Sequence, residues 1–187
     1  MEEEIKKCLD VLRKGGTILS PTDTIWGLGC DATSPEAVAR IFRIKRRLEH
    51  KSLIVLLADA SKLKTYVSVV PELVYDLLDS VDKPLTIIYP GARNLAPNLI
   101  AEDGTVAIRI VRDRFMHKLC KAFGKPISST SANISGESAP LTYQSIAPTI
   151  IDSVDHAVPG EFDEIRDVKP SRIVRLKSNG EFEVIRP

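Results

Sequence analysis

The apolar run from Leu53 to Leu57 limits the possible folds of this chain more than any other feature of its sequence. An uninterrupted aliphatic stretch of this length is typical of a β-strand that is covered on both faces. The run is too short to span a bilayer, which requires about 20 apolar residues in a helix. The sequence therefore predicts a sheet with a buried strand and helices packed against it.

Helical and strand patterns alternate along the rest of the chain. The predicted helices cover 2–14, 35–46, 59–67, 71–80, 113–123 and 142–151. The predicted strands cover 17–20, 53–57, 84–89, 106–111 and 127–130, followed by a hairpin of 171–176 and 182–185 around Asn179-Gly180. This order predicts a single α/β domain over 1–187, with an open, twisted, mixed-direction sheet and flanking helices.

Two segments lack a regular pattern. Residues 21–29 are rich in turn formers, and Thr22 and Thr24 are suited to capping a local turn there. Residues 91–104 form the longest predicted loop, and a loop of that length in a compact domain often serves as a lid.

The charge balance and the cysteines exclude several classes of protein. The chain has 187 residues with 26 Lys and Arg against 25 Asp and Glu, so a generic nucleic-acid coat is not indicated. Cys8, Cys30 and Cys120 are far apart and form no CxxC pair, which argues against disulfides and zinc sites. The acidic N-terminus carries no secretory signal. We therefore expect reduced thiols and a cytoplasmic location without membrane association.

Several familiar catalytic motifs are missing. The sequence has no GxxxxGK[ST] loop, no GxGxxG fingerprint and no GxSxG elbow. Its three histidines are not at metal-ligand spacing, so no protein-built metal site is predicted.

A basic cluster follows the second predicted helix. Residues 43–51 read RIKRRLEHK and contain five cations against one anion. A solvated helix end that complements the helix dipole explains such a cluster equally well. Lys45 and Arg47 face one site only if the helix ends beside them, and arginine suits phosphate or carboxylate.

A hydroxyl-rich segment, residues 126–136, is the second candidate binding feature. Ser129, Ser131 and Asn133 point to one face if this segment is extended. Composition alone favours a polar turn, but three small polar groups in a row also suit phosphate oxygens or an amino-acid head group.

These features together resemble the YrdC-like family of threonylcarbamoyl-AMP synthases. The resemblance rests on GGTILSPTDTIWGLGCDA, IFRIKRRLEHKSLIVL, KPLTIIYPG, TVAIRI, PISSTSANISG and PSRIV with VIRP, which span residues 15–187. It implies a twisted α/β fold with a concave basic cavity. It also implies a reaction in which L-threonine, bicarbonate and ATP give threonylcarbamoyl-AMP and pyrophosphate. The product serves a partner complex that modifies an adenosine of tRNA.

The matching motifs imply roles for particular residues. Lys45, Arg47, Ser131 and Asn133 are the implied catalytic residues. Threonine contacts are implied for Thr24, Arg109, Ser129 and Ser171. Contacts to ATP are implied for Arg47, Lys51, Thr105, Ser131 and Arg186. Mg²⁺ is expected to arrive with ATP, bridging its phosphates without a dedicated protein cage.

The chain departs from the family pattern at several places. Asp23 stands where Glu is usual, Leu48 and Ser52 replace prolines, and Leu56 replaces a His of some longer relatives. Val111 and Arg172 also differ from the usual residues. We expect these positions to lie at the edge of the site. The differences there leave the identity of the substrate open. Since the sequence ends at Pro187, we expect no second domain of the kind that longer members carry.

Two alternatives remain at this point. One is a diverged paralogue that performs other nucleotide chemistry on the same fold. The other is a double-stranded RNA-binding module, whose RNA binding we expect to be weak because the net charge is only +1.

Overall fold

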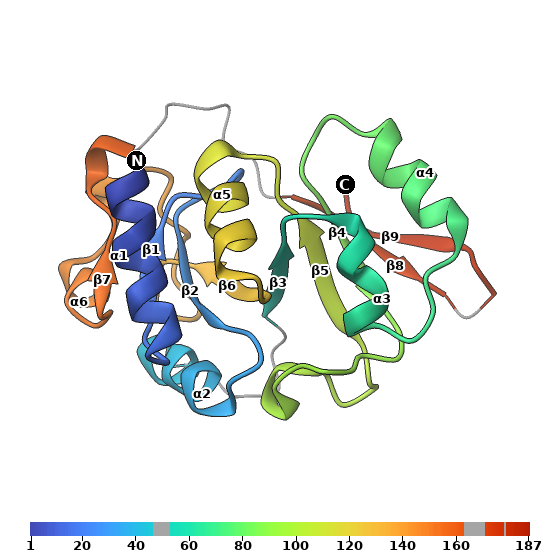
Figure 1. The fold of residues 1–187 in the computed structure, drawn as a ribbon, viewed down its shortest axis with the longest axis horizontal. Coiled ribbons are helices and arrows are strands. Elements are labelled where there is room, and N and C mark those ends of the chain that lie inside the picture. The colour runs from blue at the N-terminus through green and yellow to red at the C-terminus, as the bar shows by residue number, and fades with distance from the viewer. Residues whose placement is uncertain (47–52, 163–170, 178) are drawn as a thin grey trace.

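A computed structural model describes residues 1–46, 53–162, 171–177 and 179–187. Within these ranges nine strands form one mixed sheet in the order β7-β1-β2-β6-β3-β5-β4-β8-β9 (Figure 1). The strands are β1 (Ile18–Ser20), β2 (Gly27–Asp31), β3 (Ile54–Leu57), β4 (Leu85–Tyr89), β5 (Val106–Ile110), β6 (Ile127–Ser131), β7 (His156–Ala157), β8 (Arg172–Leu176) and β9 (Phe182–Arg186). The predicted mixed-direction α/β sheet is confirmed.

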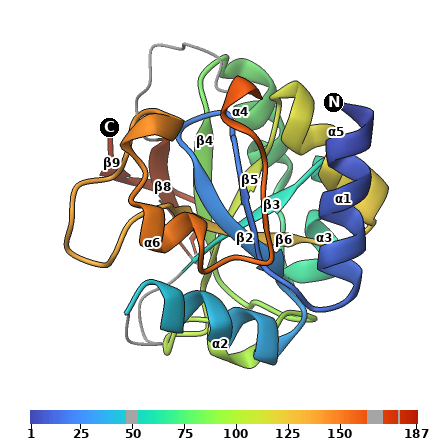
Figure 2. The same cartoon turned by 90° about the vertical axis from the view of Figure 1, so that its left-hand side faces the viewer.

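Helices cover this sheet. The α-helices are α1 (Glu2–Arg13), α2 (Pro35–Ile44), α3 (Leu63–Tyr66), α4 (Glu72–Ser80), α5 (Arg114–Phe123) and α6 (Pro148–Ile151). Short 3₁₀ turns are η1 (Ala60–Lys62), η2 (Pro97–Leu99), η3 (Tyr143–Ser145) and η4 (Gly160–Phe162). Helices α1, α5 and α3 lie on one side of the sheet, and α6 lies on the other side (Figures 1 and 2). No helix in the described ranges is long and apolar enough to cross a membrane.

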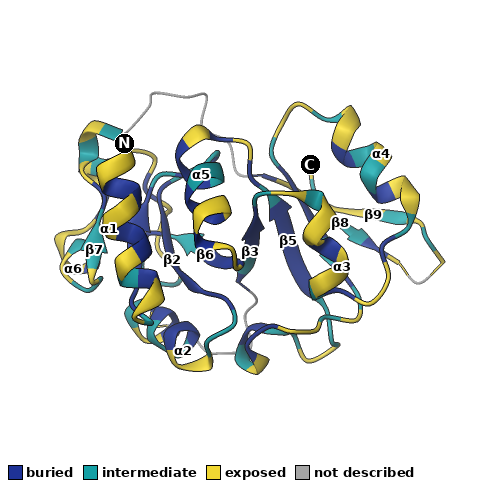
Figure 3. Cartoon of the chain, in the orientation of Figure 1, coloured by how far each residue is buried: buried dark blue, intermediate teal, exposed yellow. Residues whose placement is uncertain are grey.

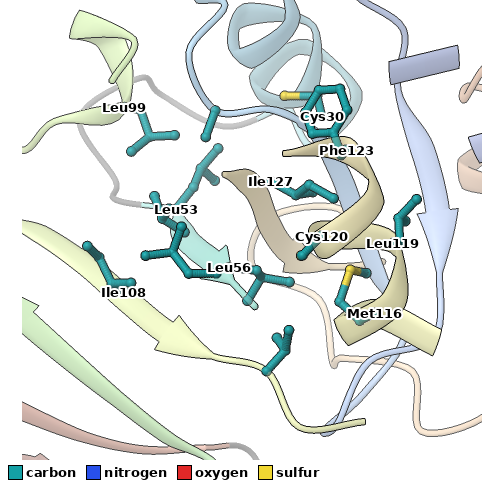
Figure 4. Close-up of a cluster of buried hydrophobic side chains, with 14 of the residues drawn as sticks. Cys30, Leu53, Leu56, Leu99, Ile108, Met116, Leu119, Cys120, Phe123 and Ile127 are labelled. Carbon is teal, nitrogen blue, oxygen red and sulfur yellow. The ribbon is translucent and has the colours of Figure 1, made fainter. Parts of the chain in front are cut away.

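The apolar run forms the centre of the sheet, as predicted. β3 pairs in parallel with β5 and antiparallel with β6, so both of its edges are hydrogen-bonded. Leu56 is fully buried, and its side chain lies in a cluster with Met116, Cys120 and Ile127 between the sheet and α5 (Figure 4). The buried residues follow the central strands and the inner faces of the helices (Figure 3). All three cysteines are free and buried.

Local signals fix the helix ends. The Ser34 hydroxyl accepts from the Ala37 amide at 3.2 Å and caps α2, with Pro35 as the first helical residue. The Asp113 carboxylate caps α5 through the amides of Phe115 and Met116. Gly124, with φ of 74°, ends α5 in the left-handed conformation that glycine adopts without strain. These ends lie close to the predicted ones.

Three predictions about secondary structure were wrong in part. The turn-rich segment 21–29 runs into strand β2, because Gly27–Asp31 pairs with both β1 and β6. The predicted helix over 142–151 is interrupted and consists of η3 and α6. Strand β7 was not predicted, since its two residues become a strand only by pairing with β1.

The long loop is fixed to the core. The Ala96 amide donates to the Ala32 carbonyl at 2.9 Å, and the Asn98 side chain donates to the Pro35 carbonyl at 3.0 Å. Leu95, Ala96 and Leu99 are buried. The loop therefore packs beside α2, and its last residues, Ala101, Glu102 and Asp103, line a cavity together with Thr105.

Candidate active site

A cavity of about 400 Å³ lies where β2, β4, β5, β6 and β8 approach one another. Six predicted site residues line it: Thr24, Arg109, Ser129, Ser131, Ser171 and Arg186. They come from distant parts of the chain, and the fold brings them to one place. The remaining lining is formed largely by small and apolar side chains, including Trp26, Ile54, Ile88 and Ile173.

Arg109 lies in the middle of β5, opposite Leu56 on one neighbouring strand and Thr86 on the other. Its side chain is only 4% exposed, and its guanidinium forms an ion pair of 2.9 Å with the carboxylate of Asp23. Burial lowers the pKa of Arg109, and the charges of Asp23 and Asp113 oppose that shift. The Nε–H group has no hydrogen-bond partner among the described residues, so the guanidinium retains donor capacity beside the cavity.

Arg186, at the end of β9, is held against Ser171. Its Nε donates to the Ser171 carbonyl at 2.9 Å, and one terminal nitrogen donates to the same oxygen at 2.6 Å. The Ser171 hydroxyl also shares a hydrogen bond of 2.9 Å with the hydroxyl of Thr86. Arg186, Ser171 and Thr86 therefore form one network on the cavity wall.

Thr86 is the supporting residue that sequence reasoning missed. It is fully buried in β4, next to Arg109 in register. Its only sequence signal is a hydroxyl in the otherwise apolar stretch Leu85–Tyr89. That signal is weak, because threonine is common in strands for its shape alone.

The turn that carries Thr24 is closed by its own side chains, as predicted. The Thr22 hydroxyl donates to the Ile25 carbonyl at 2.8 Å and accepts from the Thr24 amide at 3.1 Å. Beyond the turn, a Cβ at Gly27 would lie 2.9 Å from the Ser129 hydroxyl oxygen. Glycine at this position therefore allows β2 to approach the hydroxyl side chains of β6.

The predicted row of Ser129, Ser131 and Asn133 is only partly correct. Ser129 and Ser131 line the cavity, but β6 ends at Ser131 and a turn follows, in which the Asn133 amide donates to the Ser131 carbonyl. The Asn133 side chain donates to the Glu137 carbonyl at 2.7 Å. Asn133 therefore folds the loop after β6 and does not line the described cavity, because strand alternation stops before it.

Lys45 holds the same loop from the end of α2. Its side chain is buried, and the ammonium donates to the Ser131 carbonyl at 2.5 Å and to the Asn133 carbonyl at 2.7 Å. Helix α2 ends at Ile44, and Arg46 has a φ of 49°. The chain therefore leaves the helix at this point, which is the condition required for Lys45 and Arg47 to face one site. Arg47, Leu48, Lys51 and Ser52 lie outside the described residues.

Thr105 lines an adjoining cavity of about 360 Å³, which shares Ile88 and Ala107 with the first. Its hydroxyl donates to the Asp103 carboxylate at 2.6 Å. Thr105 and Arg109, four residues apart, therefore lie beside neighbouring hollows of the same surface.

The described substitutions fall into two groups, because Asp23 pairs with Arg109 at the cavity as expected, whereas Leu56, Val111 and Arg172 lie away from it, contrary to expectation. Leu56 and Val111 are buried, Arg172 is exposed, and none of the three lines the cavity. Their differences from the usual family residues therefore do not alter its wall.

The donors around the cavity are hydroxyls and cations. No group of three or more His, Cys, Asp or Glu side chains that suits a metal ion occurs within the described ranges. The lining of this cavity contains no carboxylate, so these residues fit anionic groups and do not provide the oxygen cage that Mg²⁺ prefers.

Comparison with known proteins places the chain in a family. The profile of the Sua5/YciO/YrdC family, described as telomere recombination, matches residues 10–187. Threonylcarbamoyl-AMP synthase of Vibrio cholerae is 34% identical over 182 residues, covering 92% of this chain and 97% of that protein. The enzyme of the same name from Xanthomonas euvesicatoria pv. vesicatoria is 32% identical over 181 residues, covering 92% and 97%.

Solved structures share the fold. A doubly substituted P. abyssi Sua5 matches with a TM-score of 0.91 and 28% identity, covering 100% of this chain and 57% of that chain. P. abyssi Sua5 complexed with L-threonine matches with a TM-score of 0.87 and 28% identity, covering 94% and 52%. E. coli YciO, at 24% identity and a TM-score of 0.85, covers 100% and 89% and shows the likeness of fold alone. This chain thus spans little more than half of the Sua5 chains. By its motifs, its profile match and its curated relatives, the chain belongs to the Sua5/YciO/YrdC family.

Proposed function

We propose that this protein is a threonylcarbamoyl-AMP synthase, which converts L-threonine, bicarbonate and ATP into threonylcarbamoyl-AMP and pyrophosphate. The observation that carries the proposal is the convergence of Thr24, Arg109, Ser129, Ser131, Ser171 and Arg186 on one cavity. The names of the curated relatives and the threonine complex of P. abyssi Sua5 support the same substrate.

The cavity offers threonine complementary groups. Arg109 provides positive charge for the carboxylate, and arginine presents donors in the fork geometry that a carboxylate accepts, while Arg186 provides positive charge for the nucleotide. Thr24, Ser129 and Ser171 provide small hydroxyls for the amine and side-chain hydroxyl of the substrate. In the proposed complex Asp23 keeps Arg109 oriented, because their ion pair is buried.

The chemistry needs no covalent enzyme intermediate. The amine nitrogen of threonine bonds to the carbon of bicarbonate while a C–O bond breaks and water leaves, or it adds to CO₂ and releases a proton, and either route gives a carbamate. A carbamate oxygen then bonds to the α-phosphorus of ATP, the bond from that phosphorus to the bridging oxygen breaks, and pyrophosphate leaves. The protein contributes by positioning the reactants and by neutralising negative charge as the leaving group departs.

The nucleotide is assigned to the other side of the cavity. Ser131 lines it, Lys45 fixes the loop that follows Ser131, and Thr105 borders the adjoining hollow. Arg47 and Lys51 are proposed phosphate ligands on the strength of their motif. Mg²⁺ bound with ATP would neutralise part of the phosphate charge, and the phosphates themselves would hold it.

The product would serve a tRNA-modifying partner complex in the cytoplasm. Threonylcarbamoyl-AMP is an activated mixed anhydride, so an acceptor must take the threonylcarbamoyl group from AMP. We assign the class of nucleotidyltransferase to this protein because the α-phosphate of ATP, with its nucleoside, is transferred to the carbamate oxygen.

The experiment that tests this function combines the pure protein with ATP, Mg²⁺, labelled bicarbonate and threonine. We expect labelled adenylate and pyrophosphate in equal amounts, and neither product when threonine is omitted. ATP hydrolysis that does not depend on threonine would instead identify a paralogue with other nucleotide chemistry. Tight, salt-resistant binding of double-stranded RNA without affinity for ATP would identify an RNA-binding module.

A further inference from the structure

A second cavity, of about 420 Å³, lies at the carboxyl end of β3 between α3 and α5. These two helices lie on the same side of the sheet, on either side of β3 (Figure 1). The second cavity shares none of its lining residues with the candidate active site. Its volume falls in the range of small-molecule sites.

The strand order places the two helices that border this hollow. β3 and β5 are parallel neighbours, so their carboxyl ends lie at the same edge of the sheet. From β3 the chain continues through α3 and α4 to β4, whereas from β5 it continues through α5 to β6. β4 and β6 lie on opposite sides of the β3–β5 pair, so each connection passes over the strand from which the other one starts. Helices α3 and α5 belong to these two connections, and the second cavity lies between them.

The wall of this cavity is predominantly cationic. Lys62, His117, Lys121 and Lys125 line it, and Asp59 is the one carboxylate in that lining. The Lys125 ammonium is paired with Asp31 at 2.9 Å. The ammonium groups of Lys62 and Lys121 have no ion pair or hydrogen bond to any of the described residues.

The helix dipole accounts for only part of this charge. Lys121 and Lys125 lie at the C-terminal end of α5, where cations are favoured without any ligand. Lys62 belongs to η1 on the facing wall, and no such effect places it there. Lys62 and Lys121 therefore bring two positive charges to one hollow, where Asp59 lies close enough for its charge to interact with that of Lys62.

The floor of the cavity is apolar. Leu57 and Cys120 are each 4% exposed and line its base. Tyr66, which is half-buried, presents its aromatic side chain to the same space. A ligand that fills this cavity therefore needs an apolar or aromatic body as well as negative charge.

We propose that this second cavity binds a small organic phosphate monoester whose phosphate lies between Lys62 and Lys121 and whose body packs on Leu57 and Tyr66. Lysine carries a compact point charge and lacks the planar fork of arginine. Two lysines in one cavity can therefore contact a single phosphate from two sides. The proposal does not depend on the function proposed for the first cavity.

The test is a titration of isotope-labelled protein with AMP, followed by NMR. The amides of Ala58 and Gly124 report on the second cavity, and the amide of Gly27 reports on the first. We expect saturable shifts of Ala58 and Gly124. In the double variant Lys62→Ala/Lys121→Ala we expect affinity at these amides to fall about tenfold or more, because two charge-assisted contacts are lost.

A matched control is the double variant Lys64→Ala/Lys118→Ala, which removes one lysine from α3 and one from α5, both outside the cavity lining. We expect it to bind AMP as the parent protein does. Equal weakening in both double variants, or no saturable shift of Gly124 at millimolar AMP, would overturn the proposal. If inorganic phosphate bound as tightly as AMP, the apolar floor would add nothing to the affinity. That result would overturn the proposal that the ligand has an apolar or aromatic body.

The proposed synthase function and the proposed ligand site in the second cavity can be disproved independently of each other. We expect the Lys62→Ala/Lys121→Ala variant to keep its threonine-dependent pyrophosphate release and the Gly27 shift. Loss of that activity with an unchanged Gly124 titration would contradict the separation of the two cavities.

Discussion

Asp23 and Arg109 form an ion pair of 2.9 Å in which the side chains are 8% and 4% exposed. The two residues also face different hollows. Arg109 lines the candidate active site, whereas Asp23 lines a neighbouring cavity of about 370 Å³ with Pro84 and Asp113. The pair thus forms part of the partition between two hollows, and breaking it affects both stability and substrate binding.

Replacing Asp23 with Asn should leave the buried guanidinium of Arg109 without its counter-charge. Removing one partner of a buried pair costs about 3 kcal/mol or more in the free energy of unfolding. Urea denaturation measures this loss. The control is Lys118→Gln, which breaks the exposed pair with Glu2 and should leave stability unchanged. Equal stability of D23N and the parent protein would show that the pair contributes nothing.

Replacing Thr86 with Val should weaken threonine binding, although Thr86 is expected to act through Ser171 and not to touch the substrate. Valine keeps the shape of the side chain but removes the hydroxyl that partners Ser171, so Ser171 and Arg186 lose their fixed geometry. We expect a KM for threonine that rises about fivefold, since about 1 kcal/mol is lost with one hydrogen bond. Thr86→Ser should restore the parent value. An unchanged KM in T86V would exclude this positioning role.

Replacing Lys45 with Met should unfold the loop after β6 as well as reduce activity. The ammonium satisfies the Ser131 and Asn133 carbonyls, and removing it leaves buried acceptors unpaired at a cost of about 2 kcal/mol or more. Hydrogen exchange at the Ser135 amide, which donates to the Lys45 carbonyl, should accelerate. Arg43→Met, an exposed change on the same helix, is the control. A fully stable but inactive K45M protein would instead assign Lys45 to direct substrate contact.

Threonine should be preferred over serine, and valine should be rejected more strongly than serine. A missing methyl group costs about 1–3 kcal/mol of discrimination, whereas a missing hydroxyl leaves buried polar groups of the cavity unpaired. The ratio of kcat/KM values for the three amino acids in pyrophosphate release measures this order. Equal activity with valine would contradict the proposal that Thr24 and Ser129 recognise the side-chain hydroxyl of the substrate.

Acid should destabilise the contact between β1 and the segment before β7. Burial raises the pKa of Asp155, but hydrogen bonds from Arg40 and Thr17 outweigh burial and hold that pKa below its ordinary value of 3.8. The folded pKa is depressed, so the stabilisation is present above the unfolded pKa and is lost as pH falls through the folded pKa.

Asp155→Asn should therefore cost less than about 1 kcal/mol at about pH 7, because solvent screens a side chain that is 39% exposed, and this difference should shrink towards about pH 3. Urea unfolding of both proteins at the two pH values measures it. If the difference in the free energy of unfolding between the two proteins were the same at both pH values, the charge of Asp155 would not contribute to stability. Lys6→Gln, on the exposed face of α1, provides the matched surface control.

The sequence by itself determined the elements whose signals are local. The apolar run of β3, the cap of α2 at Ser34 and the turn closed by Thr22 each depend on residues within a few positions of one another. The motif likeness also identified six residues that the fold gathers in one cavity. Backbone propensity and side-chain periodicity act over one helical turn or one strand, so these features can be predicted from the sequence alone.

Only the tertiary structure decided which distant groups meet. Glycine-rich β2 becomes a strand because β1 and β6 satisfy its backbone on both sides, although its own propensity disfavours a strand. Thr86 supports Ser171 because β4 and β8 are neighbours, and Lys45 turns to the Asn133 carbonyl because α2 ends beside β6. These contacts depend on the order of strands in the sheet. That order is set by the burial of the whole core, and no local pattern in the chain encodes it.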